Sequence, residues 1–182
     1  MPRPLRDQEP GIYHLTANGV RHTALFRDDA DRVSWLEHLP ELCDRYRWTC
    51  VAYCAMTTHY HLLVRTRLPN LARGMQWLNG TWGARFNRRH GEVGHVLRRR
   101  YSSAKVESEA HLLEAGRYIA LNPVHAGACL DPLDWPWSSY AAAVGPEPHG
   151  AWLDATPVLE QFGPDAEARV RYRAFVERTI GS

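Results

Sequence analysis

Two histidines, His59 and His61, lie one residue apart at the start of the apolar run THYHLLVRT, residues 58–66. Side chains alternate across a β-strand, so both imidazoles lie on one side of the strand if this run is extended. Two imidazoles held in this way can bind a metal ion or a phosphate group. For these two residues alone, structural histidines at the start of a strand are an equally good interpretation.

A second pair of polar residues has helical spacing. Tyr118 and Asn122 are four residues apart, which places them on one face of a helix, one turn from each other. Glu114 lies a further turn back on the same stripe, and His111 is near it. Such a stripe is unusual unless a polar group lies opposite, so we expect it to face the histidine pair. The alternative for Asn122 is that it caps the end of its helix before Pro123.

These two pairs of residues together suggest metal-assisted phosphoryl chemistry. Two imidazoles and one amide oxygen provide three ligands for a divalent cation such as Mg²⁺ or Mn²⁺, with positions left open for phosphate oxygens. The cation would polarise a scissile phosphate, and Tyr118 would attack phosphorus. A tyrosine phenol has an ordinary pKa of about 10, so its proton must first be removed. The sequence does not identify the base, for which a histidine and Glu114 are candidates.

The elements that must position these residues alternate between strand and helix. Pro40 should interrupt the first helix, Ser108 is a suitable N-cap for the third, and Pro123 should stop the third. Hydrophobic periodicity predicts strands over 11–20, 49–56, 58–66 and 94–108, and helices over 28–48, 70–91 and 108–124. Short helices are expected within 132–145 and 156–180.

This order predicts an α+β fold. The first six elements make a ferredoxin-like βαββαβ unit, an antiparallel sheet with two helices on one face. The third helix, which carries Tyr118, is additional to this unit and can pack on the open face of the sheet. We expect one domain over residues 11–145 and a C-terminal helical extension over 146–182, packed on or near that domain.

The composition is that of an ordinary globular protein. The 182 residues are 45% hydrophobic and 23% charged, which suits one domain with a sizeable core. No apolar run reaches the 18 residues of a membrane span, so a membrane is not an expected partner. The N-terminus MPRPLRDQEPG does not resemble a secretory signal, and the expected location is the cytoplasm.

The basic residues are almost all arginines, since Lys105 is the only lysine among 22 basic residues. Arginine binds phosphate bidentately and stacks on bases, although a GC-rich genome also explains this bias. Local clusters are more informative than the total, and a solvated surface or a favourable helix dipole is the alternative for each. The predicted nucleic-acid contacts are Arg85, Arg88, Arg98, Arg99, Arg100, Tyr101 and Lys105.

Tyr101 is also a rival nucleophile, because it follows the densest arginine cluster. It lacks an amide one helical turn further on and lies in a predicted strand, so Tyr118 is favoured. The four cysteines include Cys50 and Cys54, whose even spacing in an apolar run predicts that both face one side of a strand. Their spacing does not match a zinc site, and buried free thiols are expected.

Six motifs occur in order over residues 11–145. They are YHLTANG, LFRDDADR, AYCAMTTHYHLLV, GHVLRRRYSSAKVES, RYIALNPVHAG and WSSY. This series closely resembles the REP-associated tyrosine transposases, which are members of the HUH nucleases related to the transposases of the smallest single-strand insertion sequences. The resemblance implies that His59 and His61 are the HUH histidines, Tyr118 is the nucleophile and Asn122 is the third metal ligand.

The resemblance also implies a reaction and a substrate. Members of this family cleave and join single-stranded DNA next to a hairpin, through a 5′-phosphotyrosine intermediate and a free 3′-OH, at palindromic repeats. Insertion-sequence relatives exchange the tyrosine helix within a homodimer, for which Gly116 is a possible hinge, but a monomer is favoured here. The chain departs from the family pattern with TANG in place of an Arg-Gly-Asn run, and with Thr57-Thr58 in place of Pro-Asn.

Two other functions are compatible with the sequence. A non-catalytic module of the same fold would bind a nucleic-acid hairpin without cutting it. A metallohydrolase that activates water would cut DNA without a covalent adduct and would tolerate the loss of the Tyr118 phenol.

Overall fold

The sheet has the predicted ferredoxin-like arrangement. A computed structural model describes residues 9–20, 23–98, 100–146 and 150–178. Four strands form one antiparallel sheet in the order β2-β3-β1-β4, with the pairs β1–β3, β1–β4 and β2–β3. The strands are β1 (Gly11–Asn18), β2 (Trp48–Ala55), β3 (His59–Thr66) and β4 (Ser102–Lys105).

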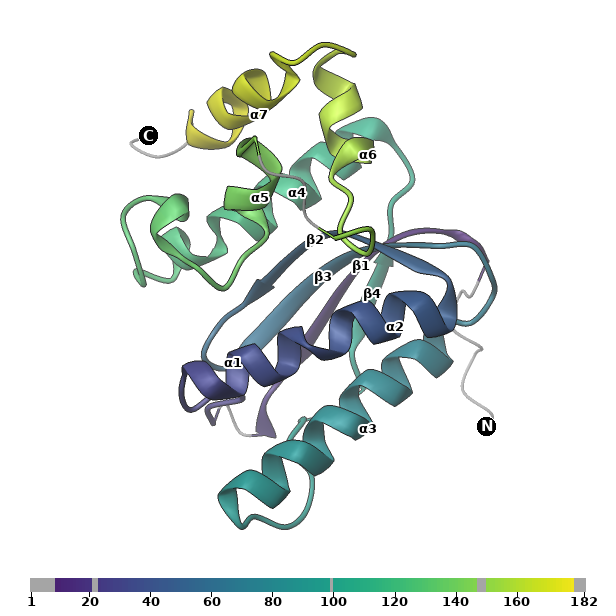
Figure 1. The fold of residues 1–182 in the computed structure, drawn as a ribbon, viewed down its shortest axis with the longest axis vertical. Helices are drawn as coiled ribbons and strands as arrows, with labels where there is room; N and C mark the ends of the chain where they lie inside the picture. Colours follow the sequence, from purple (N-terminus) through teal and green to yellow (C-terminus); the bar gives the residue numbers. More distant parts are fainter. Residues whose placement is uncertain (1–8, 21–22, 99, 147–149, 179–182) are drawn as a thin grey trace.

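Three helices cover one face of this sheet (Figure 1). They are α1 (Asp29–Leu36), α2 (His38–Tyr46) and α3 (Leu71–His90). The predicted helix over 28–48 is interrupted at Glu37 rather than at Pro40 itself. Proline lacks the N–H that would bond the carbonyl of Leu36, four residues earlier, so the break precedes Pro40 by one turn.

Aromatic and aliphatic side chains fill the layer between these helices and the sheet. Tyr13, Trp35, Tyr60 and Trp82 are almost completely buried there. The Tyr60 hydroxyl donates to Asn79 Oδ1 on α3 at 2.5 Å. Tyr60 therefore faces the core, as its place between the two histidines predicted.

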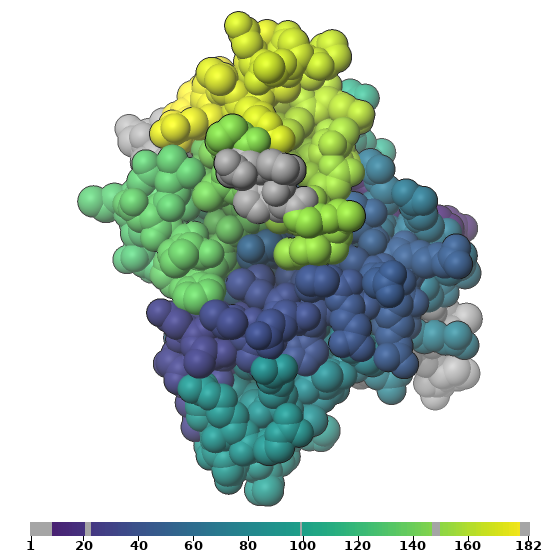
Figure 2. Space-filling model, in the orientation of Figure 1, coloured from purple at the N-terminus to yellow at the C-terminus, as the bar shows by residue number. Residues whose placement is uncertain are grey.

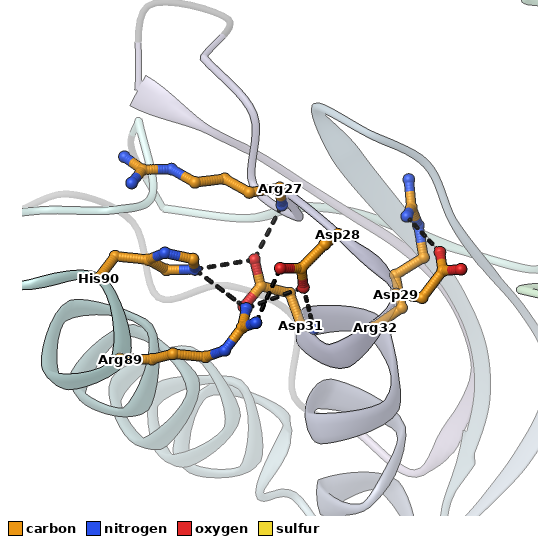
Figure 3. A network of polar contacts seen from close by, with 7 residues as sticks. All are labelled: Arg27, Asp28, Asp29, Asp31, Arg32, Arg89 and His90. Carbon is orange, nitrogen blue, oxygen red and sulfur yellow. Dashed lines mark hydrogen bonds and ion pairs between the residues drawn. The ribbon is translucent and has the colours of Figure 1, made fainter.

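A polar network joins the start of α1 to the end of α3 (Figure 3). The Asp28 carboxylate caps α1 by accepting from the backbone N–H of Asp31 at 3.0 Å. Asp31 is itself fully buried and accepts from the Arg27 backbone N–H at 2.8 Å and from Arg89. His90 Nε2 lies 2.9 Å from the same carboxylate. These contacts compensate the burial of the Asp31 charge.

On the other face of the sheet, α4 (Glu109–His125) packs against β2 and β3. Ser108 caps this helix as predicted, with its hydroxyl accepting from the His111 backbone N–H at 3.2 Å. The prediction that Pro123 stops the helix was wrong, because α4 continues to His125. Pro123 occupies the last turn, where it removes only one helical hydrogen bond.

Two strand predictions need correction. The strand expected over 94–108 is confined to β4, because pairing with β1 covers only Tyr13 to Thr16. Of the residues before it, the described ones (94–98, 100 and 101) are irregular and contribute one isolated bridge, Gly19 to Leu97. The pairing of β2 with β3 shifts register between Cys50 and Ala52, so Cys50 and Cys54 lie in different clusters on opposite faces. Both cysteines are buried free thiols, as expected.

The C-terminal segment packs on the outer side of α4. Val158, Tyr172 and Val176 share one buried cluster with Ile119 of α4 and Leu63 of β3. In the space-filling view the light green and yellow C-terminal helices lie directly against the green region that follows α4 (Figure 2). The region that follows α4 contains η2 (Pro132–Asp134) and α5 (Tyr140–Val144). The C-terminal segment contains α6 (Thr156–Leu159), η3 (Glu160–Phe162) and α7 (Ala168–Glu177). No helix within the described part of the chain is long and apolar enough to cross a membrane.

Candidate active site

His59 and His61 are placed side by side by β3. A tight turn at Thr57 and Thr58 precedes them, closed by the backbone N–H of Met56 donating to the His59 carbonyl at 2.8 Å. Because alternate residues of a strand share a face, both imidazoles point toward α4, away from the buried Tyr60. Their ring centroids are 5.0 Å apart and the rings are nearly perpendicular.

The helical stripe predicted on α4 does face these histidines. Asn122 Oδ1 lies 3.1 Å from His59 Nε2. The Tyr118 ring lies edge-on to the His61 ring, with centroids 5.3 Å apart. Asn122 is 7% exposed and Tyr118 is 47% exposed, so the amide is enclosed while the phenol stays accessible to a ligand. The four residues come together as the sequence predicted; their chemical roles stay predictions.

His14 is a member of this cluster that the sequence reasoning missed. His14 Nε2 lies 3.1 Å from His61 Nδ1, and Thr16 Oγ1 lies 3.0 Å from the same nitrogen. The His14 ring is also an edge-on neighbour of Tyr118, with centroids 5.9 Å apart. The signal was present in the alternation of YHLT, which places His14 and Thr16 opposite the buried Tyr13 and Leu15.

The surroundings of these imidazoles favour their neutral form. Burial, followed by the neighbouring His14 and His59, lowers the pKa of His61 to about 3. Burial also lowers the pKa of His59, partly opposed by its hydrogen bond with Asn122. The pKa of His14 is lowered by burial and by His111. A neutral imidazole has one nitrogen lone pair to offer, which is the form that metal ligation requires.

The donor atoms fit a divalent cation. His61 Nε2 is buried and has no hydrogen-bond partner among the described residues, while Nδ1 of the same ring contacts Thr16 and His14. His59 Nε2 and Asn122 Oδ1 are the other two candidate ligand atoms on this face, and binding of a cation by both would replace the 3.1 Å contact in which the amide oxygen accepts from the imidazole. Within the described residues no group of three or more His, Cys, Asp or Glu side chains is arranged to hold a metal. The candidate set therefore depends on the Asn122 amide oxygen as its third ligand.

Glu114 and His111, the candidate bases on α4, differ in exposure and in their neighbours. Glu114 is exposed and forms an ion pair with Arg117. Its carboxylate is thus engaged by the residue that precedes Tyr118 in sequence. His111 is half-buried and close enough to His14 to affect the pKa of His14.

Two arginines of the cluster before β4 lie on the surface near this site. Arg98 and Arg100 are exposed and line a hollow together with Asn18 and Ser102. Arg99 lies outside the described residues. Lys105 forms an ion pair with Glu9 at 3.0 Å.

Tyr101 requires a correction. Its side chain is 7% exposed and belongs to the core cluster beneath the sheet. The segment before β4 turns this ring into the core, so Tyr101 is not available to nucleic acid or as a nucleophile in this structure.

The two predicted nucleic-acid contacts on α3 lie away from the histidines. Arg85 and Arg88 are on α3, which the sheet separates from α4, and Arg85 forms an ion pair with Glu37 at 2.9 Å. A DNA contact by Arg85 or Arg88 stays a prediction from the sequence. In the C-terminal helices, Arg171 and Arg173 form ion pairs with Asp165 and Glu177.

The chain was compared with known families and structures. The sequence model of the IS200-like transposases matches residues 9–122. No curated protein sequence matches the chain. A solved structure described as a REP-associated tyrosine transposase bound to a REP hairpin is similar over 84% of this chain and 96% of its own, with 13% identity and a TM-score of 0.66. A crystal structure of a transposase-like protein from Deinococcus radiodurans aligns over 62% of this chain and 91% of its own, with 20% identity and a TM-score of 0.44.

Proposed function

Because this chain belongs to the IS200-like transposase family, we propose that it is a metal-dependent tyrosine transposase that cleaves and rejoins single-stranded DNA next to a hairpin. The observation that carries this proposal is the meeting of the accessible Tyr118 phenol with His59, His61 and Asn122 in one polar cluster. His59 and His61 come from a strand, whereas Tyr118 and Asn122 come from a helix more than fifty residues later. The cluster is therefore not a product of local sequence.

The reaction assigned to Tyr118 is a transesterification. The phenol loses its proton and its oxygen forms a bond to the scissile phosphorus. The bond from phosphorus to the 3′-oxygen of the preceding nucleotide breaks, and that oxygen takes up a proton. The products are a 5′-phosphotyrosine and a free 3′-OH, and attack by a 3′-OH on the phosphotyrosine reverses the step and joins two strands.

His59, His61 and Asn122 would hold a divalent cation, Mg²⁺ or Mn²⁺. When bound, the cation supplies positive charge that polarises the phosphate and stabilises its developing negative charge. The protein's own contribution is to fix the three donor atoms and to bring the phenol beside them. The exposure of Tyr118 leaves room for a nucleotide strand at the site.

We assign His14 as a positioning residue for His61. If His61 Nε2 is the metal-binding nitrogen, the proton of the neutral ring is on Nδ1, which then donates to His14 Nε2 or Thr16 Oγ1. These contacts select the required tautomer and fix the orientation of the ring.

The proposed substrate is a DNA hairpin with a single-stranded flank, formed by a palindromic repeat. The structural neighbour of the same fold is described as bound to a REP hairpin, which supports this choice. We further propose that one chain forms a complete site as a monomer. The support is that Tyr118 lies against His61 of its own chain, on a helix packed between the sheet and the C-terminal segment.

The proposal is tested by trapping the covalent intermediate. We expect purified protein with Mn²⁺ and labelled hairpin oligonucleotides carrying single-stranded flanks to give a protein–DNA adduct that resists denaturing electrophoresis. Tyr118→Phe should abolish the adduct, and removal of the metal by chelation should do the same. Tyr101→Phe is the matched control, since that ring is buried in the core, and it should retain the adduct.

Two outcomes would contradict the proposal. Tight hairpin binding without any adduct would indicate a non-catalytic module. Cleavage that persists in Tyr118→Phe would indicate a hydrolase that uses water.

A further inference from the structure

The face of the sheet that carries the histidines is only partly covered. The helix α4 packs on β2 and β3, at one side of this face. At the other side, Ser102 and Ala104 of β4, which are opposite Thr16 and His14, are exposed. An open strip therefore runs beside the candidate active site over β1 and β4.

The strand register fixes which side chains belong to this strip. Residues directly opposite each other on paired strands share a face of the sheet. Asn18 of β1 is opposite His59, and Thr16 of β1 is opposite His61. Ser102 of β4 is in turn opposite Thr16. Asn18 and Ser102 consequently point to the same side as the two histidines.

The strip ends in a hollow lined by Asn18, Arg98, Arg100 and Ser102. The backbone N–H of Arg98 donates to the Asn18 carbonyl at 2.8 Å, which anchors the arginine segment to the end of β1. Neighbouring strands are about 4.8 Å apart, so the hollow begins roughly 5 to 10 Å from the histidines. The axial rise of a stacked strand, about 3.4 Å per nucleotide, is a lower limit on the spacing of consecutive phosphates, so this distance corresponds to at most three nucleotides.

The lining chemistry suits a phosphate group. The Arg100 guanidinium, the Asn18 side-chain amide and the Ser102 hydroxyl can each donate a hydrogen bond, and none of the four lining residues carries a carboxylate. Arginine, asparagine and serine are among the side chains that contact DNA phosphates. Among the four described residues that line the hollow, none offers an anionic ligand to a cation and none offers an aromatic ring to a base, and the nearby Tyr101 is buried.

We propose that this hollow binds a backbone phosphate of the DNA strand one to three nucleotides from the scissile phosphate. The proposal rests on the proposed function, because it takes the His59 and His61 site as the place of cleavage. The bound phosphate would fix the direction in which the DNA strand crosses β1 and β4. It would thereby place the scissile phosphate beside Tyr118.

The first measurement is the salt dependence of DNA binding. The probe is a fluorescein-labelled hairpin oligonucleotide with single-stranded flanks, bound to the Tyr118→Phe protein so that no chemistry occurs. Arg100→Gln removes one charge at an exposed position, and the control Arg73→Gln removes an exposed charge on α3, across the sheet. We expect Arg100→Gln to reduce the salt slope by about 0.7 and the affinity about fivefold at 0.1 M salt. Arg73→Gln should change neither quantity, and thermal melting confirms that both variants fold.

The second measurement locates the contact. Neutral methylphosphonate linkages are placed one at a time on each side of the bond that the wild-type protein cleaves. We expect one linkage, one to three nucleotides from the cleaved bond, to weaken binding about fivefold. The same substitution should have no effect in Arg100→Gln.

The outcomes separate this inference from the proposed function. If the wild-type protein forms an adduct but Arg100→Gln keeps the parent salt slope and the parent methylphosphonate profile, the phosphate site is refuted and the transposase reaction stands. If the wild-type protein forms no adduct on any hairpin, the proposed function fails and this inference fails with it.

Discussion

At the scale of single residues, the site depends on how His61 is held. Its ring is 3% exposed, with Nδ1 in contact with Thr16 and His14, and Nε2 buried without a partner among the described residues. A buried, unpaired nitrogen costs free energy unless something else binds it. The arrangement is therefore more consistent with a ligand site than with a structural histidine.

Loss of His14 should weaken the proposed metal site without removing one of its proposed ligands. We expect His14→Ala to lower the affinity for Mn²⁺ by about tenfold, since removing an outer-shell partner typically costs 10- to 100-fold and Thr16 remains in place. His61→Ala should cost more. Calorimetric titration with Mn²⁺ measures both, and His125→Ala at the exposed end of α4 is the control. An unchanged affinity in His14→Ala would refute the positioning role.

At the scale of elements, a polar network that holds the fold together and the candidate active site lie on opposite faces of the sheet. The network at the start of α1 and the end of α3 includes the ion pairs of Arg89 with Asp28 and Asp31 (Figure 3). It lies on the side opposite α4. Changes in this network should therefore affect folding more than catalysis.

Asp28 provides a test of this network through pH. Its hydrogen bonds with the Arg89 side chain and the Asp31 backbone lower the pKa of Asp28 from 3.8 to about 2. A carboxylate whose pKa is lower in the folded state stabilises the protein above the ordinary pKa, and this contribution is lost as the pH falls toward 2. Asp28→Asn keeps the helix cap and removes the charge.

We expect the wild-type protein to lose more stability than Asp28→Asn between pH 4 and pH 2. Urea unfolding at a series of pH values measures this difference. Parallel pH profiles for the two proteins would show that the ion pair contributes nothing.

At the scale of the whole molecule, α4 is held on two sides. Its inner side packs on β2 and β3, and its outer side packs on the C-terminal helices. Gly116, the possible hinge, faces the C-terminal helices: a Cβ added there would lie 3.5 Å from Val158 Cγ2 and 3.6 Å from Tyr172 Oη, which are ordinary contact distances. Exchange of α4 between two chains would have to break both interfaces, which supports a site made by one chain.

Mixing two inactive variants tests this arrangement. We expect Tyr118→Phe and His61→Ala to stay inactive together, because neither chain then has a complete site. Adduct formation is measured with the same labelled hairpin for each variant alone and for the mixture. Restored adduct in the mixture would show that one chain supplies the tyrosine to the histidines of another.

The sequence by itself determined the features that depend on local order. The alternation around His59 and His61, the four-residue spacing of Tyr118 and Asn122, and the Ser108 cap each involve neighbours in the chain, so periodicity and capping preferences were sufficient. The order of these elements also gave the sheet topology, because few arrangements connect them with short loops.

Only the tertiary structure decided the features that depend on pairing between distant segments. The register of β1 against β3 brings His14 to His61, and the register shift in β2 sends Cys50 and Cys54 to opposite faces. The short pairing of β4 leaves Arg98 and Arg100 at the surface and turns Tyr101 into the core. A shift of one residue in register moves a side chain to the other face, and register is set by contacts across the whole sheet rather than by neighbours in sequence.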